Sequence, residues 1–592
     1  MNLNRTFSRL AIVFVALSFL GITLGCTKKN SAKENVLNNA ITANLKGMDP
    51  IYANDAYSNQ VISNIYEPLF EYHYLKRPLE LQPLVASAMP TASKDGLTHT
   101  IKIKKGIKFQ DDEAFPEGKG RDLTAKDFIY SWKRLADPAN QSDGFWIFDG
   151  KIKGLNEWRE KMGKGEASYE DEIEGLQAPD DETLVIKLTK PYFQLYYVLA
   201  MNYSAPVPKE AVDKYGKEFI NHPVGTGPFK LDSWTRNSKV VLVKNPTWHG
   251  GKYPSEGEEG DDARGLLKDA GKDLPFVDKV VYSEIIEDQP RWLNFMKGKL
   301  DIVIIPKDNF DTSVSGDKLS KDLTDKGLKL EINEEPDVTY MAFNMLDPIL
   351  GKNLELRRAI SLATDTNTLL ERFYNGRGVN ALSPIPPGID GYDKDFKNPY
   401  KEFNIEKAKE HLKKAGYPDG KGLPEFEYST TNSTTARQMA EYTQQNLAAL
   451  GIKIRIAATS WPQFTDKLRE KKAQMWGIAW SADYPDAENF LQLLYGKNVS
   501  PGPNSANYVN KKFDELYEKA LKLPPSPERT VIYKQMKEIF VQDLPWIPNI
   551  HRKAYVLYHG WIENYKRHAI INGEAKYIRV NLNQKAKLAE KL

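Results

Sequence analysis

The sequence contains very little cysteine and carries almost no net charge. Cys26 is the only cysteine among 592 residues, so an intrachain disulfide cannot form. The net charge is +3, from 82 Lys and Arg against 79 Asp and Glu. This near balance gives no electrostatic basis for binding nucleic acid or an anionic membrane surface. A disulfide scaffold and a nucleic-acid-binding protein are therefore both disfavoured.

The motifs of several enzyme classes and metal sites are missing as well. The eight His residues form no His-Glu-x-x-His zinc pair, and no Gly-x-Ser-x-Gly nucleophile turn occurs. Gly225-Thr226-Gly227 is followed by proline rather than by the Lys-Ser/Thr helix start of a phosphate-binding loop. Asp483 and Asp486 are close carboxylates, but Pro485 between them favours a turn. We expect no catalytic residue, metal or cofactor, although a hydrolase with catalytic groups far apart in sequence stays an alternative.

The first 26 residues have the pattern of an export signal. Arg5 and Arg9 precede an apolar stretch, Leu10–Leu24, that is short for a membrane span. Leu24-Gly25-Cys26 then resembles the lipobox of bacterial lipoproteins, with Thr23 where leucine is usual. The resemblance implies cleavage before Cys26 and a lipid on that residue, which would anchor the protein outside the cytoplasm, in the periplasm or at the cell surface. An ordinary cleaved signal with an incidental thiol is the alternative.

The length and the order of apolar patterns predict more than one α/β domain. A chain of 592 residues is too long for a single core. Helical patterns at Leu354–Ala363 and Ala436–Leu450 precede the alternating Ile452, Ile454 and Ile456 of a strand. This helix–strand order predicts parallel neighbours in a sheet. Thr247–Asp273, in contrast, is Gly-rich and acidic, and we expect a solvated surface insertion rather than a calcium loop.

A short apolar run, Met475–Trp480, reads as a buried strand that Pro485 prevents from continuing. Gly477 and Ala479 leave one face of this strand nearly bare, which suits the close approach of another backbone. An extended peptide could add itself there as a strand, with Asp483 taking its terminal ammonium. Tight core packing and a turn-capping Asp are the alternative explanation.

Trp480-Ser481-Ala482-Asp483-Tyr484, followed by Asp486 and Phe490-Leu491, resembles the ligand strand of the extracytoplasmic oligopeptide-binding proteins. These are the family 5 solute receptors of ABC importers. The resemblance implies that Ala479, Trp480, Ser481 and Tyr484 lie at the bound peptide and that Asp483 holds its α-amino group. It extends from about Leu45 to Val580. Ala56 falls where the family's backbone also touches ligand, and Phe145-Trp146 falls where the family places an aromatic on the cleft wall, although packing explains that pair equally well.

The resemblance implies a two-lobed, periplasmic-binding-protein-like α/β fold of class II with an extra subdomain on the first lobe. The predicted boundaries are 1–25 for a lipoprotein signal peptide, 26–40 for a tether, 41–72, 205–304 and 549–592 for lobe I, 73–204 for the extra subdomain, and 305–548 for lobe II. It also implies a monomeric, non-enzymatic receptor that binds oligopeptides and docks on an ABC permease, with no nucleic acid as partner. The same fold binding a sugar, a metal chelate or another non-peptide solute is the alternative.

Overall fold

The computed structural model describes residues 34–52, 55–570 and 573–592. Residues 35–592 form one compact unit, which contains the sheets and helices named below. The predicted signal peptide, 1–25, and the predicted lipidation site, Cys26, lie outside the described residues. Residues 36–40, at the end of the predicted tether, belong to the first strand of a sheet.

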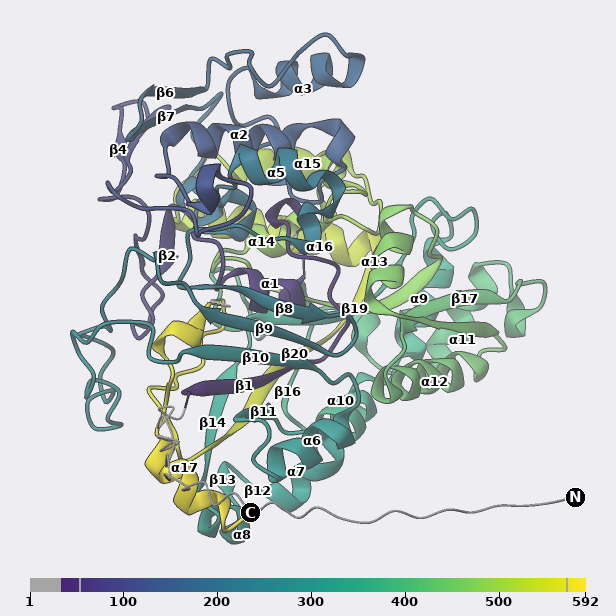
Figure 1. Cartoon of the computed structure of the whole chain (residues 1–592). Helices are drawn as coiled ribbons and strands as arrows, with labels where there is room; N and C mark the ends of the chain where they lie inside the picture. Colours follow the sequence, from purple (N-terminus) through teal and green to yellow (C-terminus); the bar gives the residue numbers. More distant parts are fainter. Residues whose placement is uncertain (1–33, 53–54, 571–572) are drawn as a thin grey trace, which may run out of the picture. The chain divides into compact units, whose positions relative to one another are not determined.

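The first lobe is built on a mixed sheet (Figure 1). Its order is β1 (Val36–Ile41), β10 (Lys279–Glu284), β9 (Lys239–Lys244) and β8 (Phe229–Thr235). β1 is parallel to β10, and the other pairs are antiparallel. Val280 and Tyr282 alternate with more exposed neighbours, so this sheet turns one face of β10 to the core.

The second lobe is built on a larger sheet. Its order is β11 (Ile302–Ile304), β20 (Trp546–His559), β15 (Asp337–Phe343), β19 (Met475–Ser481), β17 (Phe426–Thr431) and β18 (Ile454–Thr459), with β14 (Leu328–Glu334) and β16 (Gly378–Asn380) also paired to β20. β17 is parallel to both β18 and β19, which confirms the parallel neighbours predicted from the helix–strand order. β15 is antiparallel to β19 and β20, and all its residues are buried.

A separate small sheet is formed by residues that come after β1 and before β8 in the chain. It consists of β4 (Thr91–Ala92), β5 (Thr98–Lys102), β7 (Thr183–Lys187) and β6 (Leu176–Asp180). The helix α2 (Ala125–Ala136) begins with a capping box of Thr124 and Asp127. Its apolar face, Phe128, Trp132 and Leu135, is fully buried.

Helices cover the parallel part of the second-lobe sheet (Figure 1). They include α9 (Leu354–Ala363), α11 (Ile405–Lys414), α12 (Thr434–Ala448) and α13 (Trp461–Arg469). Two later helices, α15 (Lys511–Ala520) and α16 (Pro527–Asp543), lie away from β17 in Figure 1. Polar side chains close the first turns of α11 and α13: Asn404 accepts from the Lys407 amide, and Ser460 forms a capping box with Gln463. Among the described residues, every helix is too short or too polar to cross a membrane.

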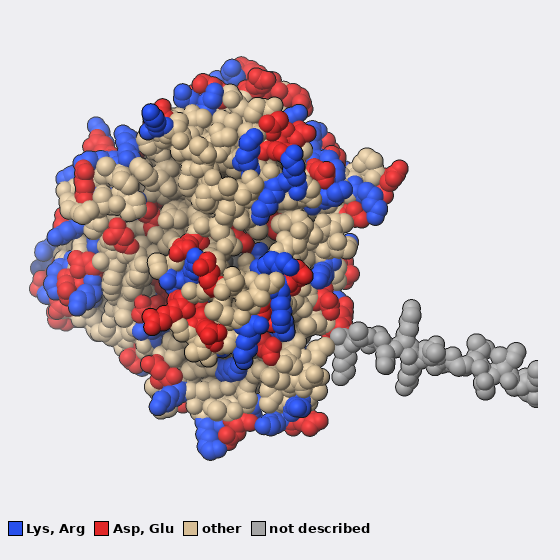
Figure 2. Space-filling model, turned by 90° about the vertical axis from the view of Figure 1, so that its left-hand side faces the viewer, with Lys and Arg blue, Asp and Glu red and all other residues tan. Residues whose placement is uncertain are grey.

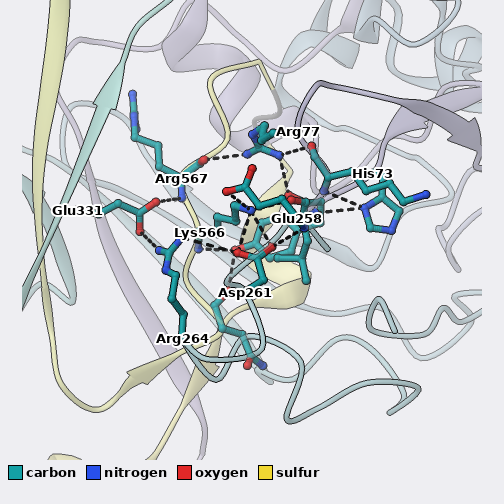
Figure 3. Close-up of polar contacts among 12 residues, drawn as sticks. His73, Arg77, Glu258, Asp261, Arg264, Glu331, Lys566 and Arg567 are labelled. Carbon is teal, nitrogen blue, oxygen red and sulfur yellow. Dashed lines mark hydrogen bonds and ion pairs between the residues drawn. The ribbon is translucent and has the colours of Figure 1, made fainter. Parts of the chain in front are cut away.

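The acidic insertion Thr247–Asp273 is not merely solvated surface. Tyr253 and Leu266 are buried in a small apolar cluster, and the Asp261 side chain is only 1% exposed. Both Asp261 oxygens accept from Lys566 Nζ, at 2.7 and 3.0 Å (Figure 3). The expectation of a solvated insertion is therefore wrong for this part of the segment, because a distant lysine neutralises its central acid.

Charged side chains of both signs are mixed on the surface. On the face drawn in Figure 2, Lys and Arg lie among Asp and Glu rather than in one continuous patch. Positive and negative side chains are therefore mixed on this face, as their near-equal numbers in the sequence would allow.

Candidate functional site

The strand β19 has one edge that is only half covered. β15 pairs with it along its whole length, from Met475 to Ser481. On the other side, β17 pairs only with Met475 and Trp476. From Gly477 to Ser481 this edge therefore has no strand partner among the described residues, and its backbone groups face a cavity. Such an edge is a template for an added strand.

The cavity has a volume of about 880 Å³ and is lined by both lobes. Tyr57 and Tyr282 line it from the first lobe, and Tyr428, Trp461 and the residues of β19 line it from the second. Tyr57 and Trp461 meet edge to face across it, with ring centroids 5.5 Å apart. The cavity is thus an interlobe cleft with aromatic walls.

Gly477 makes room for a side chain of the neighbouring strand. A Cβ on Gly477 would lie 2.5 Å from the Tyr428 hydroxyl, which is closer than real contacts allow. The sequence had indicated that the bare face at this position is left open for an approaching backbone. In the structure Tyr428 occupies this face instead. The unpaired edge still begins at Gly477, because β17 pairs with β19 only as far as Trp476.

Asp483 follows the end of β19 and lies on the cleft wall. The amide Nδ2 of Asn489 donates to its Oδ2 at 2.9 Å. Asn489 Oδ1 in turn accepts from the Asp483 backbone amide at 2.9 Å and from Trp480 Nε1 at 3.0 Å. Asn489 thereby fixes both the acid and the indole beside it.

The Asp483 carboxylate lacks a cation among the described residues. Burial raises its pKa to about 6; the hydrogen bond from Asn489 opposes that rise, and the nearby Glu488 adds to it. A buried acid in this state gains from an incoming ammonium, which would replace the lost hydration. The site is therefore an acceptor for a positive group placed next to an open strand edge.

The sequence matches the profile of bacterial extracellular solute-binding proteins, family 5 Middle, over residues 80–502. The chain belongs to this family. A relative from Escherichia coli O1:K1, the glutathione-binding protein GsiB, is 29% identical over 533 residues, which cover 88% of this chain and 90% of the relative.

Solved structures give the same fold for this family 5 protein. The DppA periplasmic binding protein of Helicobacter pylori, in complex with the peptide STSA, superposes with a TM-score of 0.76 at 25% identity, over 93% of this chain and 98% of that one. Burkholderia pseudomallei OppA superposes with a TM-score of 0.77 at 22% identity, over 93% and 99%. The two-lobed α/β fold predicted from the sequence is thus confirmed.

The structure of the family 5 protein brings most of the predicted site residues to one cleft. Those that line it are Ala56, Ala479, Trp480, Ser481 and Asp483. Ala56 is the exposed first residue of α1 (Ala56–Ile62), which Asp55 caps by accepting from the Ser58 amide.

Three predicted residues lie away from the cleft lining. Tyr484 is wholly buried: its hydroxyl donates to Glu488 and its ring stacks on Tyr197, with centroids 5.7 Å apart. Phe145 and Trp146 belong to a short helical turn, η4 (Phe145–Ile147), and pack in the core of the first lobe. The Arg159 guanidinium lies 4.4 Å from the Phe145 ring centroid. Packing, the alternative left open for this aromatic pair, is what the structure shows.

Sequence reasoning missed two kinds of cleft residue. Asn489 was not singled out, although a polar residue inside the apolar run around Phe490 was a usable signal. Arg567 and Glu574, on the returning segment near the C-terminus, also line the cleft. No local pattern marks them, because their position depends on how the last part of the chain crosses back to the first lobe.

Proposed function

We propose that this family 5 protein is a lipid-anchored extracytoplasmic receptor that binds oligopeptides between its lobes and delivers them to an ABC import permease. The observation that carries the proposal is the juxtaposition of an unpaired strand edge, 477–481, with an uncompensated acid, Asp483, in one cleft. The lipid anchor rests on the Leu24-Gly25-Cys26 pattern of the sequence. We assign the protein no enzyme activity.

The geometry supports an extended ligand with a free amino end. From its first to its last Cα, the open edge of five residues spans about 13 Å, which is four steps of roughly 3.3 Å and gives room to pair with four or five peptide residues. Main-chain hydrogen bonds of this kind do not depend on the peptide's side chains. Asp483, just past the end of the edge, would bind the α-ammonium group.

The relatives support a peptide or a peptide-like solute. The Helicobacter pylori neighbour was solved with a tetrapeptide, and the Escherichia coli relative is named for glutathione. Glutathione binding is the second candidate because that relative aligns over most of both chains. Glutathione carries one ammonium and two carboxylates, so the cleft would have to bind one more negative group than it does for a tetra-alanine peptide.

Isothermal titration calorimetry with tetra-alanine, N-acetyl-tetra-alanine and glutathione tests the proposal. We expect tetra-alanine to bind and Asp483→Ala to weaken it about a hundredfold or more, because an unpaired buried ammonium costs about 3 kcal/mol. The acetylated peptide should bind wild type weakly and be nearly indifferent to this substitution. Asp232→Ala, which removes an exposed acid outside the cleft, is the matched control.

Two results would contradict the assignment. Equal affinity of the Asp483→Ala variant for tetra-alanine would remove Asp483 as the ammonium site, and binding of glutathione without any peptide would replace the ligand class. Mass spectrometry of the peptide after incubation checks the enzyme alternative, since a receptor returns it uncleaved.

A further inference from the structure

The Lys and Arg side chains that line the cleft all have ionic or hydrogen-bonding partners within the protein. Those with a carboxylate at ion-pair distance are Lys46, Arg291, Lys307, Arg469, Arg552, Lys553 and Arg567. The remaining one, Arg377, donates to the carbonyl oxygens of Tyr374 and Ile305 and to Asn375 Oδ1. The described cleft lining therefore offers an anionic ligand group no cation that lacks a partner.

The acids of the same cleft are not all neutralised. Asp143, Asp288 and Glu335 have cationic partners, and Asp55 caps α1. Asp483 and Glu574 line the cleft without an ion pair to any described residue, and Glu574 also lacks a hydrogen bond to the described part of the chain. Asp55 also has no ion pair to a described residue, but both of its oxygens accept hydrogen bonds from Ser58. Asp483 and Glu574 are therefore the two cleft acids best placed to bind a cation, and the ammonium of one peptide end accounts for one of them.

Glu574 begins a short helical turn, η11 (Glu574–Tyr577), on the first-lobe side of the cleft. The turn is fixed to that lobe, because Lys576 Nζ donates to Glu71 at 2.7 Å and the Phe276 amide donates to the Lys576 carbonyl at 3.2 Å. Asp483 is on the second-lobe wall, after β19. The two acids therefore reach a ligand from different lobes.

The two nearby arginines, Arg567 and Arg77, bind other groups and form no ion pair with Glu574. Arg567 Nε and Nη2 donate to the Glu335 carboxylate at 2.6 and 3.0 Å. The Arg567 backbone amide donates to Glu331 at 2.9 Å (Figure 3). Arg77 donates to three backbone carbonyls, including that of Arg567 at 3.0 Å.

The segment that carries Arg567 is itself held in place. The adjacent Lys566 Nζ is bound by Asp261, by Glu258 at 3.1 Å and by the Leu75 carbonyl at 2.7 Å. Because several charge-assisted hydrogen bonds hold this segment, we do not expect Lys566 or Arg567 to move and pair with Glu574.

We propose that Glu574 is a second recognition point of the cleft, which binds the cationic side chain of a lysine or arginine in the bound peptide. The inference rests on the peptide function proposed above. The preferred ligand is then a basic oligopeptide, with its α-ammonium on Asp483 and a side-chain cation on Glu574. Glutathione, with one ammonium and two carboxylates, leaves Glu574 unmatched.

The electrostatic surroundings agree with this assignment. The pKa of Glu574 is raised to about 7, mainly by burial and also by Glu331 and Glu335, while Arg567 and Arg77 oppose the rise. The tyrosines whose own pKa values respond to Glu574 are Tyr74, Tyr282 and Tyr565. A bound cation would favour the charged carboxylate, so binding of a basic peptide near neutral pH should release protons.

A lysine scan of tetra-alanine, with norleucine as the uncharged match at each position, tests the proposal by calorimetry. Wild type should prefer lysine to norleucine about tenfold or more at one position. Glu574→Gln should reduce this preference to less than about twofold and leave the affinity for tetra-alanine unchanged. Glu590→Gln, at an exposed position outside the cleft, is the matched control and should keep the preference.

The pH dependence gives a second readout that needs no variant. The lysine-to-norleucine ratio of wild type should fall as the pH is lowered from 8 to 6, because Glu574 becomes protonated. The ionisation of Asp483 changes the affinity of both peptides by the same factor, because both carry the same α-ammonium. It therefore does not change the ratio.

The outcomes separate the two proposals. Wild type that does not distinguish lysine from norleucine at any position, or a Glu574→Gln variant that keeps the preference, overturns the role of Glu574. Failure of every peptide to bind, tetra-alanine included, overturns the proposed function instead.

Discussion

Asp483 illustrates a conflict between binding and stability at a single residue. Its carboxylate is partly buried on the cleft wall and, among the described side chains, accepts a hydrogen bond from Asn489, so the ligand-free protein holds an acid whose ionisation is unfavourable. The same property would make the site attractive to an ammonium. An acid retained for a ligand in this way would lower the stability of the empty protein.

We predict that Asp483→Asn stabilises the ligand-free protein at pH 8. Because the folded-state pKa of Asp483 is about 6, above the ordinary 3.8, the folded protein binds the extra proton between these values. Wild type should thus gain stability as the pH falls through 6 toward 4, and the Asn variant should not. The difference at pH 8 should be about 2–3 kcal/mol and should vanish below pH 4.

Chemical denaturation at pH 4, 6 and 8, without ligand, measures this difference, with Asp232→Asn as the exposed control. A variant that is no more stable than wild type at pH 8 would show that the environment of Asp483 does not penalise its charge.

Sequence reasoning reached Asp483 but not its partners, for a physical reason. The acid follows a strand and precedes a proline turn, a pattern contained in a few residues, 475–486. Asn489 bonds to Asp483 from a turn that folds back on β19, and Glu574 lines the cleft from a segment far along the chain. Tyr484 sits in the same local pattern as Asp483, yet its side chain points to the core, where its hydroxyl donates a hydrogen bond to Glu488. A pattern of residues does not fix such orientations.

At the scale of elements, the open edge of β19 exists because β17 and β19 separate. β17 leaves β19 after Trp476 and continues along β18, while β15 stays with β19 to its end. Tyr428, on β17, lies against Gly477 at the point of separation. The strand itself was predictable from its apolar run, but the open edge depends on pairings between distant segments.

N-methylation of the peptide tests whether the edge pairs with a ligand backbone. In a strand ladder only alternate amides face the neighbouring strand, so methyl groups at alternate positions of tetra-alanine should weaken binding. Each harmful position should cost about 1–3 kcal/mol, or roughly ten- to a hundredfold in Kd, and the others should cost little. Calorimetry with the singly methylated peptides measures the pattern. Uniformly small losses would mean that the peptide backbone does not pair with β19.

Locally encoded elements were predicted well, and elements held by distant contacts were not. The helix at 354–363 and the strand that begins at Met475 were predicted because their apolar patterns are complete within a few residues. β20 is a strand of 14 residues whose apolar pattern is interrupted by Pro548 and the polar residues after it. The acidic insertion was misread because Asp261 and its partner Lys566 are 305 residues apart.

At the scale of the whole molecule, the first-lobe segment 73–204, predicted to be a subdomain, touches the second lobe beside the cleft. Gln194 Nε2 donates to Asp486 Oδ2 at 3.4 Å, and the Tyr197 ring stacks on Tyr484. Asp486 is also held by Arg529 at 3.0 Å and by the Tyr533 hydroxyl at 3.0 Å. The domain boundaries stay a prediction, but these contacts show which side chains hold the arrangement in which Asp483 lines the cleft.

Tyr197→Ala should weaken binding of every peptide by the same factor. Loss of the stacked pair lowers the population of the closed, binding-competent arrangement, and the apparent Kd rises by the inverse of that population. An aromatic pair contributes about 0.5–1.5 kcal/mol, so we expect a loss of roughly threefold to tenfold. The preference for free over acetylated peptides should not change, because Asp483 is untouched. Phe193→Ala, which removes a side chain that is 44% exposed on the same segment, is the control.

Calorimetry with the tetra-alanine pair gives these ratios, and small-angle X-ray scattering of the ligand-free variant should show a larger radius of gyration than wild type. A variant that loses affinity for only some peptides would place Tyr197 in ligand contact and contradict a role in closure. An unchanged Kd with an unchanged radius would mean that the stacked pair does not hold the lobes together. The two measurements therefore separate the energy of closing the cleft from the energy of filling it.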